Sequence, residues 1–203
     1  MNWRTIESKW QKRWVEAKIF EADPDQSRPK CFVTFPFPYM SGPLHVGHGY
    51  SCSRVDVYAR YKRMCGYNML FPWAWHWTGE TVAGASERIK LGDEKFIKAL
   101  KDVDEVPEEE LKKFVDPAYM AKYYTDYNRE AVIKFGLSVD WRREFHTTSL
   151  HPAFSRFVEW QYKKLRERNF VVQGTHPVVW CPKCESPTGE ADRLEGEGVS
   201  PEE

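Results

Sequence analysis

Apolar side chains recur at helical spacing in several stretches of the chain, and short apolar runs lie between these stretches. In residues 5–20, Ile6, Trp10 and Trp14 are four positions apart among basic and polar residues, which predicts an amphipathic helix. We interpret its aromatic stripe as a face that packs onto the main body of the protein, with a partner-binding helix as the alternative.

A strand, a helix and a second strand are predicted to follow in close succession. Residues 31–35 are aromatic and β-branched, which predicts a strand that ends at Pro36. Residues 45–64 predict a helix that stops at Gly66, and residues 68–71 predict another strand. Such a βαβ unit has parallel strands joined by a right-handed crossover. The predicted architecture is therefore α/β with a parallel sheet.

The remainder of the chain alternates further helical patterns with polar stretches. Helices are predicted for three segments, residues 81–90, 116–136 and 152–168. The charged stretch 101–113 predicts a solvated surface. Two short apolar runs, residues 170–172 and 178–180, predict strands on either side of Gly174.

Composition agrees with a folded globular protein. The 203 residues are 41% hydrophobic and 30% charged, which supports a packed core and excludes a disordered or collagen-like chain. Thirty basic and thirty acidic residues give zero formal charge, so total charge offers no argument for a nucleic-acid binder. Recognition depends on how charge is distributed, and a local basic face is compatible with this total.

The cysteines and the N-terminus bear on location. Five cysteines, an odd number, without a secretory segment favour a reducing compartment. The charged, Trp-rich N-terminus is unlike a signal or transit peptide. No apolar run reaches the roughly 20 residues that a membrane-spanning helix needs. We therefore expect a cytoplasmic protein with no membrane partner.

The most informative segment is residues 36–48, PFPYMSGPLHVGH. Ligands of an open parallel sheet bind beyond the carboxyl ends of its strands, where this loop must lie. His45 and His48 are three positions apart at the start of the predicted helix, where free N–H groups and the helix dipole favour phosphate. Gly47 lacks a Cβ that would obstruct a base or sugar. The motif alone also fits two surface histidines or half of a metal site, and it is neither a dinucleotide-binding loop nor a P-loop.

With its neighbouring blocks, this segment resembles the class I aminoacyl-tRNA synthetases. FPFPYMSGPLHVGH is similar to their His-Ile-Gly-His region, and residues 61–80, YKRMCGYNMLFPWAWHWTGE, resemble the block that follows in the leucine, isoleucine, valine and methionine subgroup. Residues 136–148 and 175–184 resemble later blocks. Residues 74–79, AWHWTG, favour the archaeal and eukaryotic cytosolic leucine type, with valine and isoleucine enzymes as the nearest alternatives.

The resemblance implies a fold and an activity. The fold would be the Rossmann-like parallel sheet of a class I catalytic domain, first half only. Residues 1–30 would form an N-terminal helix and connector, 31–172 the half domain, and 173–203 the start of an inserted connective region. The activity would be ATP-dependent conversion of leucine to leucyl-adenylate and its transfer to the leucine tRNA, with Mg accompanying ATP. Such catalysis is positioning plus electrostatic stabilisation, without a covalent enzyme intermediate.

The resemblance also assigns site residues. His45 and His48 would be the catalytic pair that contacts the ATP phosphates. The remaining ATP-binding residues would be Pro38, Tyr39, Ser41, Gly42 and Gly47. Phe37, Tyr39 and His76 would line the amino-acid pocket. Because His76 replaces an aspartate of bacterial leucine enzymes, either this histidine or a backbone carbonyl would neutralise the substrate's ammonium.

The second motif of the family, Lys-Met-Ser-Lys-Ser, does not occur in this sequence. The chain would then supply one half of an active site and be inactive alone, and a complementary chain that carries the other half is an expected partner. A hypothesis of a different class is a non-catalytic module that binds nucleotide or assembles with a partner chain.

Two further clusters have competing interpretations. Cys181 and Cys184 form a C-x-x-C knuckle typical of half of a zinc ribbon, so Zn held by this chain alone is the weaker interpretation and a site completed beyond residue 203 the stronger. The remaining cysteines are interpreted as small buried residues; they are Cys31, Cys52 and Cys65. An aromatic run either packs in the core or stacks on a ligand; its members are Phe71, Trp73, Trp75 and Trp77.

Overall fold

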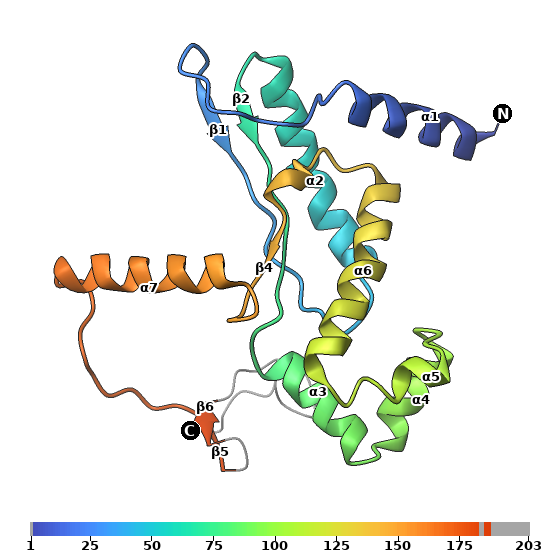
Figure 1. Ribbon diagram of the computed structural model, residues 1–203, viewed down its shortest axis with the longest axis vertical. Coiled ribbons are helices and arrows are strands. Elements are labelled where there is room, and N and C mark those ends of the chain that lie inside the picture. The colour runs from blue at the N-terminus through green and yellow to red at the C-terminus, as the bar shows by residue number, and fades with distance from the viewer. Residues whose placement is uncertain (1, 183–184, 188–203) are drawn as a thin grey trace. The chain divides into compact units, whose positions relative to one another are not determined.

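The computed structural model describes residues 2–182 and 185–187, and its elements are shown in Figure 1. The chain divides into two compact units. Unit 1 contains the residues up to His76 together with Lys122–His146, and unit 2 contains Trp77–Ala121 together with the residues from Thr147 onward. Among the described residues, no helix has the length and apolar character needed to cross a membrane.

Unit 1 is built on the predicted βαβ unit. Strand β1 (Lys30–Phe32) pairs in parallel with β2 (Asn68–Leu70), and helix α2 (Val46–Met64) connects them. The pairing brings Cys31 opposite Met69. The sequence-based prediction of two parallel strands joined by a helix is confirmed, although β1 ends before the two prolines.

A second parallel pairing extends the structure beyond the ends of these strands. Strand β3 (Ala74–Trp75) pairs with β4 (Phe145–His146), and Tyr39 forms an isolated parallel bridge with His76. The N–H of Met40 donates to the carbonyl of His76 at 3.1 Å, and the N–H of His76 donates to the carbonyl of Pro38 at 2.9 Å. The loop that precedes α2 is thereby fixed beside β3.

Large aromatic side chains fill the centre of unit 1. Phe71, Trp73 and Trp75 are buried, and the ring of Trp73 stacks on Phe35 at 5.4 Å. The indole N–H of Trp75 donates to Glu144 at 2.8 Å. These three members of the aromatic run therefore pack in the core, as one of the two interpretations predicted.

Two helices complete unit 1. Helix α1 (Trp3–Glu16) begins at the cap residue Asn2 and ends before Lys18, whose φ of 52° is left-handed. Helix α6 (Pro117–Phe135) ends before Gly136, as predicted. Gln11 of α1 donates to the carbonyl of Lys134 at 2.9 Å. No residue of α1 is fully buried, so its expected docking face packs only in part.

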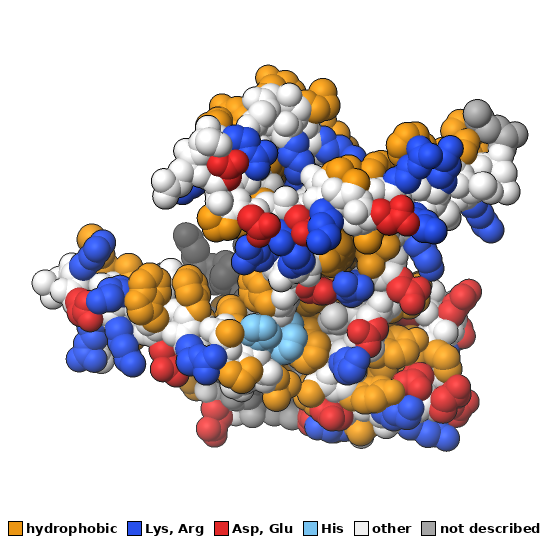
Figure 2. Space-filling model, turned by 45° about the horizontal axis from the view of Figure 1, so that its top comes forward, with side chains coloured by type: hydrophobic (Ala, Val, Ile, Leu, Met, Phe, Trp, Pro, Cys, Tyr) orange, Lys and Arg blue, Asp and Glu red, His pale blue; other side chains and the backbone are white. Residues whose placement is uncertain are grey.

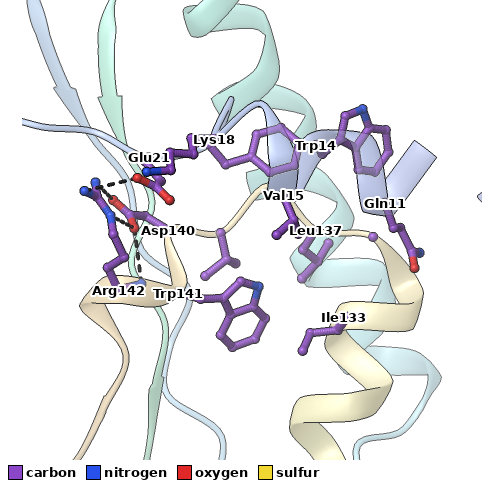
Figure 3. Close-up of a pocket in the computed structure, with 13 residues that line it drawn as sticks. Gln11, Trp14, Val15, Lys18, Glu21, Ile133, Leu137, Asp140, Trp141 and Arg142 are labelled. Carbon is purple, nitrogen blue, oxygen red and sulfur yellow. Dashed lines mark hydrogen bonds and ion pairs between the residues drawn. The ribbon is translucent and has the colours of Figure 1, made fainter. Parts of the chain in front are cut away.

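The α1 face covers a small cavity of about 150 Å³, drawn in Figure 3. Apolar side chains such as Trp14, Leu137 and Trp141 line it, and Arg142 closes one rim through ion pairs with Glu21 and Asp140. Burial alone would raise the pKa of Asp140, but hydrogen bonds from Arg142 and the Ala22 N–H lower it by more. This cluster fastens the connector after α1 to the 3₁₀ turn η1 (Trp141–Arg143).

Unit 2 is mainly helical. Its helices are α3 (Glu80–Lys90), α4 (Glu94–Asp102), α5 (Glu108–Leu111) and α7 (Pro152–Glu167), and α6 begins in it. A short antiparallel pair, β5 (Trp180–Cys181) and β6 (Ser186–Pro187), follows α7.

Three sequence-based expectations are wrong. The stretch 101–113 is not only a solvated surface, because Val106 and Leu111 are buried and α5 lies within it. Residues 170–172 form no strand, since Phe170 and Val172 are exposed and neither lies in a described strand pairing. Of the three cysteines expected to be buried, Cys52 is buried, Cys31 is half-buried, and Cys65 is exposed because it follows the last turn of α2.

Candidate functional site

The start of α2 holds the two histidines of the motif in one compact arrangement. His45 is the N-cap residue, and its Nδ1 accepts the N–H of Gly47 at 3.1 Å. The Nδ1 of His48 in turn accepts the N–H of His45 at 3.2 Å. The two rings are 4.0 Å apart between centroids. Both imidazoles therefore satisfy backbone donors that a helix start otherwise leaves free.

These hydrogen bonds define the tautomer of each neutral ring. An imidazole nitrogen that accepts a hydrogen bond carries no proton, so a neutral ring in this position carries its proton on Nε2. Burial lowers the pKa of His48, and the neighbouring His45 lowers it further. The result is two N–H donors beside a helix N-terminus, a combination that favours an anionic ligand.

The structure shows why the residue between the two histidines, Gly47, has no side chain. A Cβ at this position would lie 2.9 Å from Cε1 and 3.0 Å from Nδ1 of His45. The ring of His45 folds over the first turn of α2 and occupies the space that a side chain would need. The reason inferred from sequence, room for a base or sugar, stays a prediction.

The loop before the histidines is held by a residue that sequence reasoning missed. Asn128 of α6 is fully buried and hydrogen bonds to Leu44 and Gly42. Its one signal in the sequence is a polar residue at helical spacing between the buried Tyr124 and Val132.

The predicted amino-acid-binding residues come together on the second parallel pairing. The ring of Tyr39 lies 4.3 Å from that of His76, and Phe37 meets Phe145 edge-on at 5.3 Å. Burial lowers the pKa of His76, which favours its neutral form. Phe145 was not predicted, because its nearness depends on the register of β4 with β3.

A network of charged side chains fixes α2 against the loop that follows α6. Asp56 accepts the N–H of Ser138 at 2.6 Å and pairs with Arg60 at 2.6 Å. Arg60 also donates to the carbonyl of Gly136 at 2.6 Å, and Arg63 donates to the hydroxyl and the carbonyl of Ser138. This network therefore sets the position of the helix whose first turn carries both histidines.

A cavity of about 490 Å³ lies between the first turns of α2 and the second half of α6. His45 and His48 line it together with apolar side chains such as Val132 and Phe135. Figure 2 shows histidine side chains exposed at the surface with hydrophobic side chains around them. His45 is exposed and His48 is half-buried, so a ligand can reach both.

The structure gives fewer contacts for the remaining predicted site residues. Ser41 and Gly42 lie in the loop that Asn128 holds, and Pro38 accepts the hydrogen bond from His76 described above. Cys184 and the side chain of Cys181 lie outside what the structure describes, so the zinc half-site stays a prediction. Within the described part of the chain, no three His, Cys, Asp or Glu residues form a group able to hold a metal ion.

Comparison with known proteins identifies the family of the chain. A family model described as tRNA synthetases class I (I, L, M and V) matches residues 9–197. Leucine–tRNA ligase of Aeropyrum pernix is 51% identical over 98% of this chain and 21% of its own length. Leucine–tRNA ligase of Pyrococcus horikoshii is 52% identical over 98% of this chain and 21% of its own length. The chain thus spans about a fifth of the length of these relatives.

A solved structure supports the fold. The ternary complex of Agrobacterium radiobacter K84 agnB2 LeuRS-tRNA-LeuAMS matches with a TM-score of 0.64 and 24% identity, over 88% of this chain and 19% of that one. The predicted fold class, the Rossmann-like parallel sheet of a class I catalytic domain, is confirmed. The predicted domain boundaries and site roles stay predictions. The chain belongs to the class I tRNA synthetases of the isoleucine, leucine, methionine and valine group.

Proposed function

We propose that this chain is the part of a leucine–tRNA ligase that binds ATP and leucine through the start of α2 and the loop before it. The observation that carries the proposal is the pair of N–H donors of His45 and His48 at a helix N-terminus. The relatives that are about half identical to the chain are leucine–tRNA ligases, which supports leucine over valine or isoleucine.

In the proposed first step, a leucine carboxylate oxygen attacks the α-phosphorus of ATP. A phosphorus–oxygen bond forms to leucine, and the bond to the leaving pyrophosphate breaks. His45 and His48 would donate hydrogen bonds from Nε2 to phosphoryl oxygens whose charge changes in this step. Donors fixed in advance stabilise the transition state without reorganisation.

In the second step, a terminal hydroxyl of the leucine tRNA attacks the carbonyl carbon of leucyl-adenylate, and AMP leaves. The chain itself needs no nucleophilic side chain for either step. Mg would accompany ATP as the counter-ion of its phosphates, and no described residue is assigned as its ligand.

Substrate contacts are proposed for two groups of residues. The nucleotide would lie against Pro38, Tyr39, Ser41, Gly42 and Gly47, in addition to the two histidines. Leucine would lie against Phe37, Tyr39 and His76. A neutral His76 brings no negative charge, so it would accept one hydrogen bond from the ammonium while a backbone carbonyl supplies further neutralisation.

The test is ATP–pyrophosphate exchange by the full-length protein, with leucine, valine and isoleucine offered separately. We expect exchange to depend on leucine. Exchange driven equally well by valine or isoleucine would contradict the assigned specificity. A pocket that binds an aliphatic side chain distinguishes one methylene by about 1–3 kcal/mol, so a preference for leucine over valine of at least about tenfold is expected.

Because the chain spans about a fifth of its relatives, we also propose that the remaining polypeptide, in the same or a complementary chain, completes the active site in the cytoplasm. The 203 residues alone should support no leucine-dependent exchange, whereas the full-length protein should. Activity of the isolated chain at the full-length rate would show that this half is sufficient.

A further inference from the structure

Asn128 is completely buried in the middle of α6, although asparagine is seldom found without solvent contact. Helix positions 124, 128 and 132 form one buried row, and the two neighbours of Asn128 in this row are Tyr124 and Val132. An apolar side chain at position 128 would continue the row. The buried amide therefore calls for a specific partner.

That partner is the backbone of the loop before α2. The Oδ1 atom of Asn128 accepts the N–H of Leu44 at 2.8 Å, and Nδ2 donates to the carbonyl of Gly42 at 3.0 Å. Nδ2 also lies 3.6 Å from Sδ of Met40, which is itself buried. One side-chain amide thus satisfies a donor and an acceptor that are two residues apart.

The orientation of the amide is unambiguous. Reversing it would set Nδ2 against the Leu44 N–H and Oδ1 against the Gly42 carbonyl, so both hydrogen bonds would become repulsive. A buried backbone N–H or carbonyl without a partner is strongly unfavourable. The bridge by Asn128 therefore stabilises this conformation of the loop.

The bridged loop leads directly into the histidine pair. Leu44 is followed by His45, whose own N–H is held by Nδ1 of His48. Fixing Leu44 therefore fixes the residue that begins α2. Ser41 and Gly42, which are proposed to contact ATP, lie within the bridged segment.

We infer that Asn128 is a positioning residue that holds the ATP-binding loop in its binding conformation; this inference rests on the proposed function. Residues 38–40, which include the proposed leucine contact Tyr39, have a second anchor, because the N–H of Met40 and the carbonyl of Pro38 hydrogen bond to the backbone of His76. Loss of Asn128 should therefore weaken the binding of ATP and leave leucine binding nearly intact.

The test is N128L in the full-length protein, with V139A as the matched control. Leucine has the same branch at Cγ as asparagine but forms no side-chain hydrogen bonds. Val139 is a buried residue of the same unit that lines the cavity under α1 instead of the loop. In leucine-dependent exchange, N128L should raise the KM for ATP about tenfold or more and change the KM for leucine by about twofold or less. V139A should leave both KM values unchanged.

A purely structural role would lower the fraction of folded enzyme, and so the apparent kcat, at unchanged KM for ATP. That result in N128L would overturn the inference. If N128L does not fold, amide hydrogen exchange of the unsubstituted protein tests whether the Leu44 N–H is held in a hydrogen bond. The Leu44 amide should exchange about a hundredfold more slowly than a free peptide, and exchange at the free rate would overturn the inference that Asn128 holds the loop.

The two proposals fail in distinguishable ways. An unsubstituted protein without leucine-dependent exchange would count against the proposed function. The protection of the Leu44 amide would still report whether Asn128 holds the loop.

Discussion

At the scale of single residues, Gly47 shows how one missing side chain determines the geometry of a site. The ring of His45 occupies the space beside the Gly47 Cα, and a Cβ there would lie 2.9 Å from Cε1 of that ring. A larger residue must rotate His45 away from the helix start. The glycine thus permits the histidine to cap the helix and to present Nε2 outward.

The substitution G47A should therefore separate activity from stability. Displacement of His45 should lower leucine-dependent exchange by about ten- to a hundredfold. The unfolding free energy should change little, because the helical preference of alanine, about 0.5–1 kcal/mol, offsets part of the lost cap. Exchange kinetics and urea unfolding of the full-length protein measure the two effects.

The matched control is G84A in α3, where a Cβ would meet no atom within 4 Å. This variant should be stabilised by about 0.5–1 kcal/mol and keep full exchange activity. Full activity in G47A would show that the folded-over position of His45 is not required.

His48 makes stability depend on pH. Burial lowers the pKa of His48 below its ordinary value of 6.5, so the unfolded chain binds a proton at a higher pH than the folded chain does. The stabilisation is complete above about pH 6.5 and is lost as pH falls toward the folded-state pKa. Protonation of His48 at Nδ1 would also place this N–H against the backbone N–H of His45, and two donors repel each other.

Urea unfolding at about pH 7.5 and pH 5.5 should thus show a lower stability at the acidic value. His76 shifts in the same direction, so two groups contribute to the slope. In H48N the slope should shrink, because asparagine can accept the His45 N–H without titrating. The lowered pKa of Asp140 acts below about pH 4 and leaves this window unaffected. A slope unchanged in H48N would assign the pH dependence to other groups.

At the scale of elements, α2 is held in place by buried charge as well as by apolar packing. Asp56 accepts a backbone N–H from the loop after α6 and pairs with Arg60 on its own helix. Removing the carboxylate leaves the Ser138 N–H and the Arg60 guanidinium without this partner. An N–H and a guanidinium that lose a buried partner are far more costly than an exposed pair that separates.

We expect D56A to lower the unfolding free energy by about 2–4 kcal/mol, because the Ser138 N–H and Arg60 lose their shared partner. D56N should cost less, since its amide oxygen can still accept from Ser138. The control is D126A, which removes the same i,i+4 kind of pair, Lys122–Asp126, at an exposed position of α6. That change should cost about 0.5 kcal/mol or less by urea unfolding. Equal losses in D56A and D126A would show that the Asp56 network does not secure α2.

Helix boundaries with a local chemical signal were predictable, and those without one were not. The stop at Gly136 and the start at Pro152 each follow from the conformational limits of one residue, whereas the capping role of His45 was not predicted. Helix α4 was missed because its apolar residues stand among charges, although Asp93 caps it through the Phe96 N–H. A possible cap residue within a charged stretch is weak evidence for a helix. The helix becomes stable only when its apolar face packs against another element.

At the scale of the whole molecule, the histidine pair and the βαβ unit were predictable because both follow from contiguous sequence. Asn128 and Phe145 were not, because each reaches the site through contacts between segments far apart in the chain. The apolar residues four positions to either side of Asn128 indicate a buried face, but nothing local shows that its amide bridges a loop. The parts of a site that position others are therefore harder to predict than the parts that carry chemistry.

The apolar surface of the 203-residue chain leads to a prediction about its behaviour alone. No residue of α7 is buried, and Phe157 and Trp160 are 57% and 54% exposed with their rings 5.6 Å apart. Exposed apolar clusters bind hydrophobic dyes and promote association. The double substitution F157E/W160K should therefore reduce dye binding and self-association of the isolated chain about twofold or more, and it should leave the thermal midpoint unchanged because neither ring supports a core. Fluorescence, light scattering and thermal melts measure the three quantities.

A control at two buried residues, F71A/W75A, should lower the midpoint and increase dye binding, since it opens the core of unit 1. A midpoint lowered as far by F157E/W160K as by the control would mean that α7 packs its aromatic face in solution.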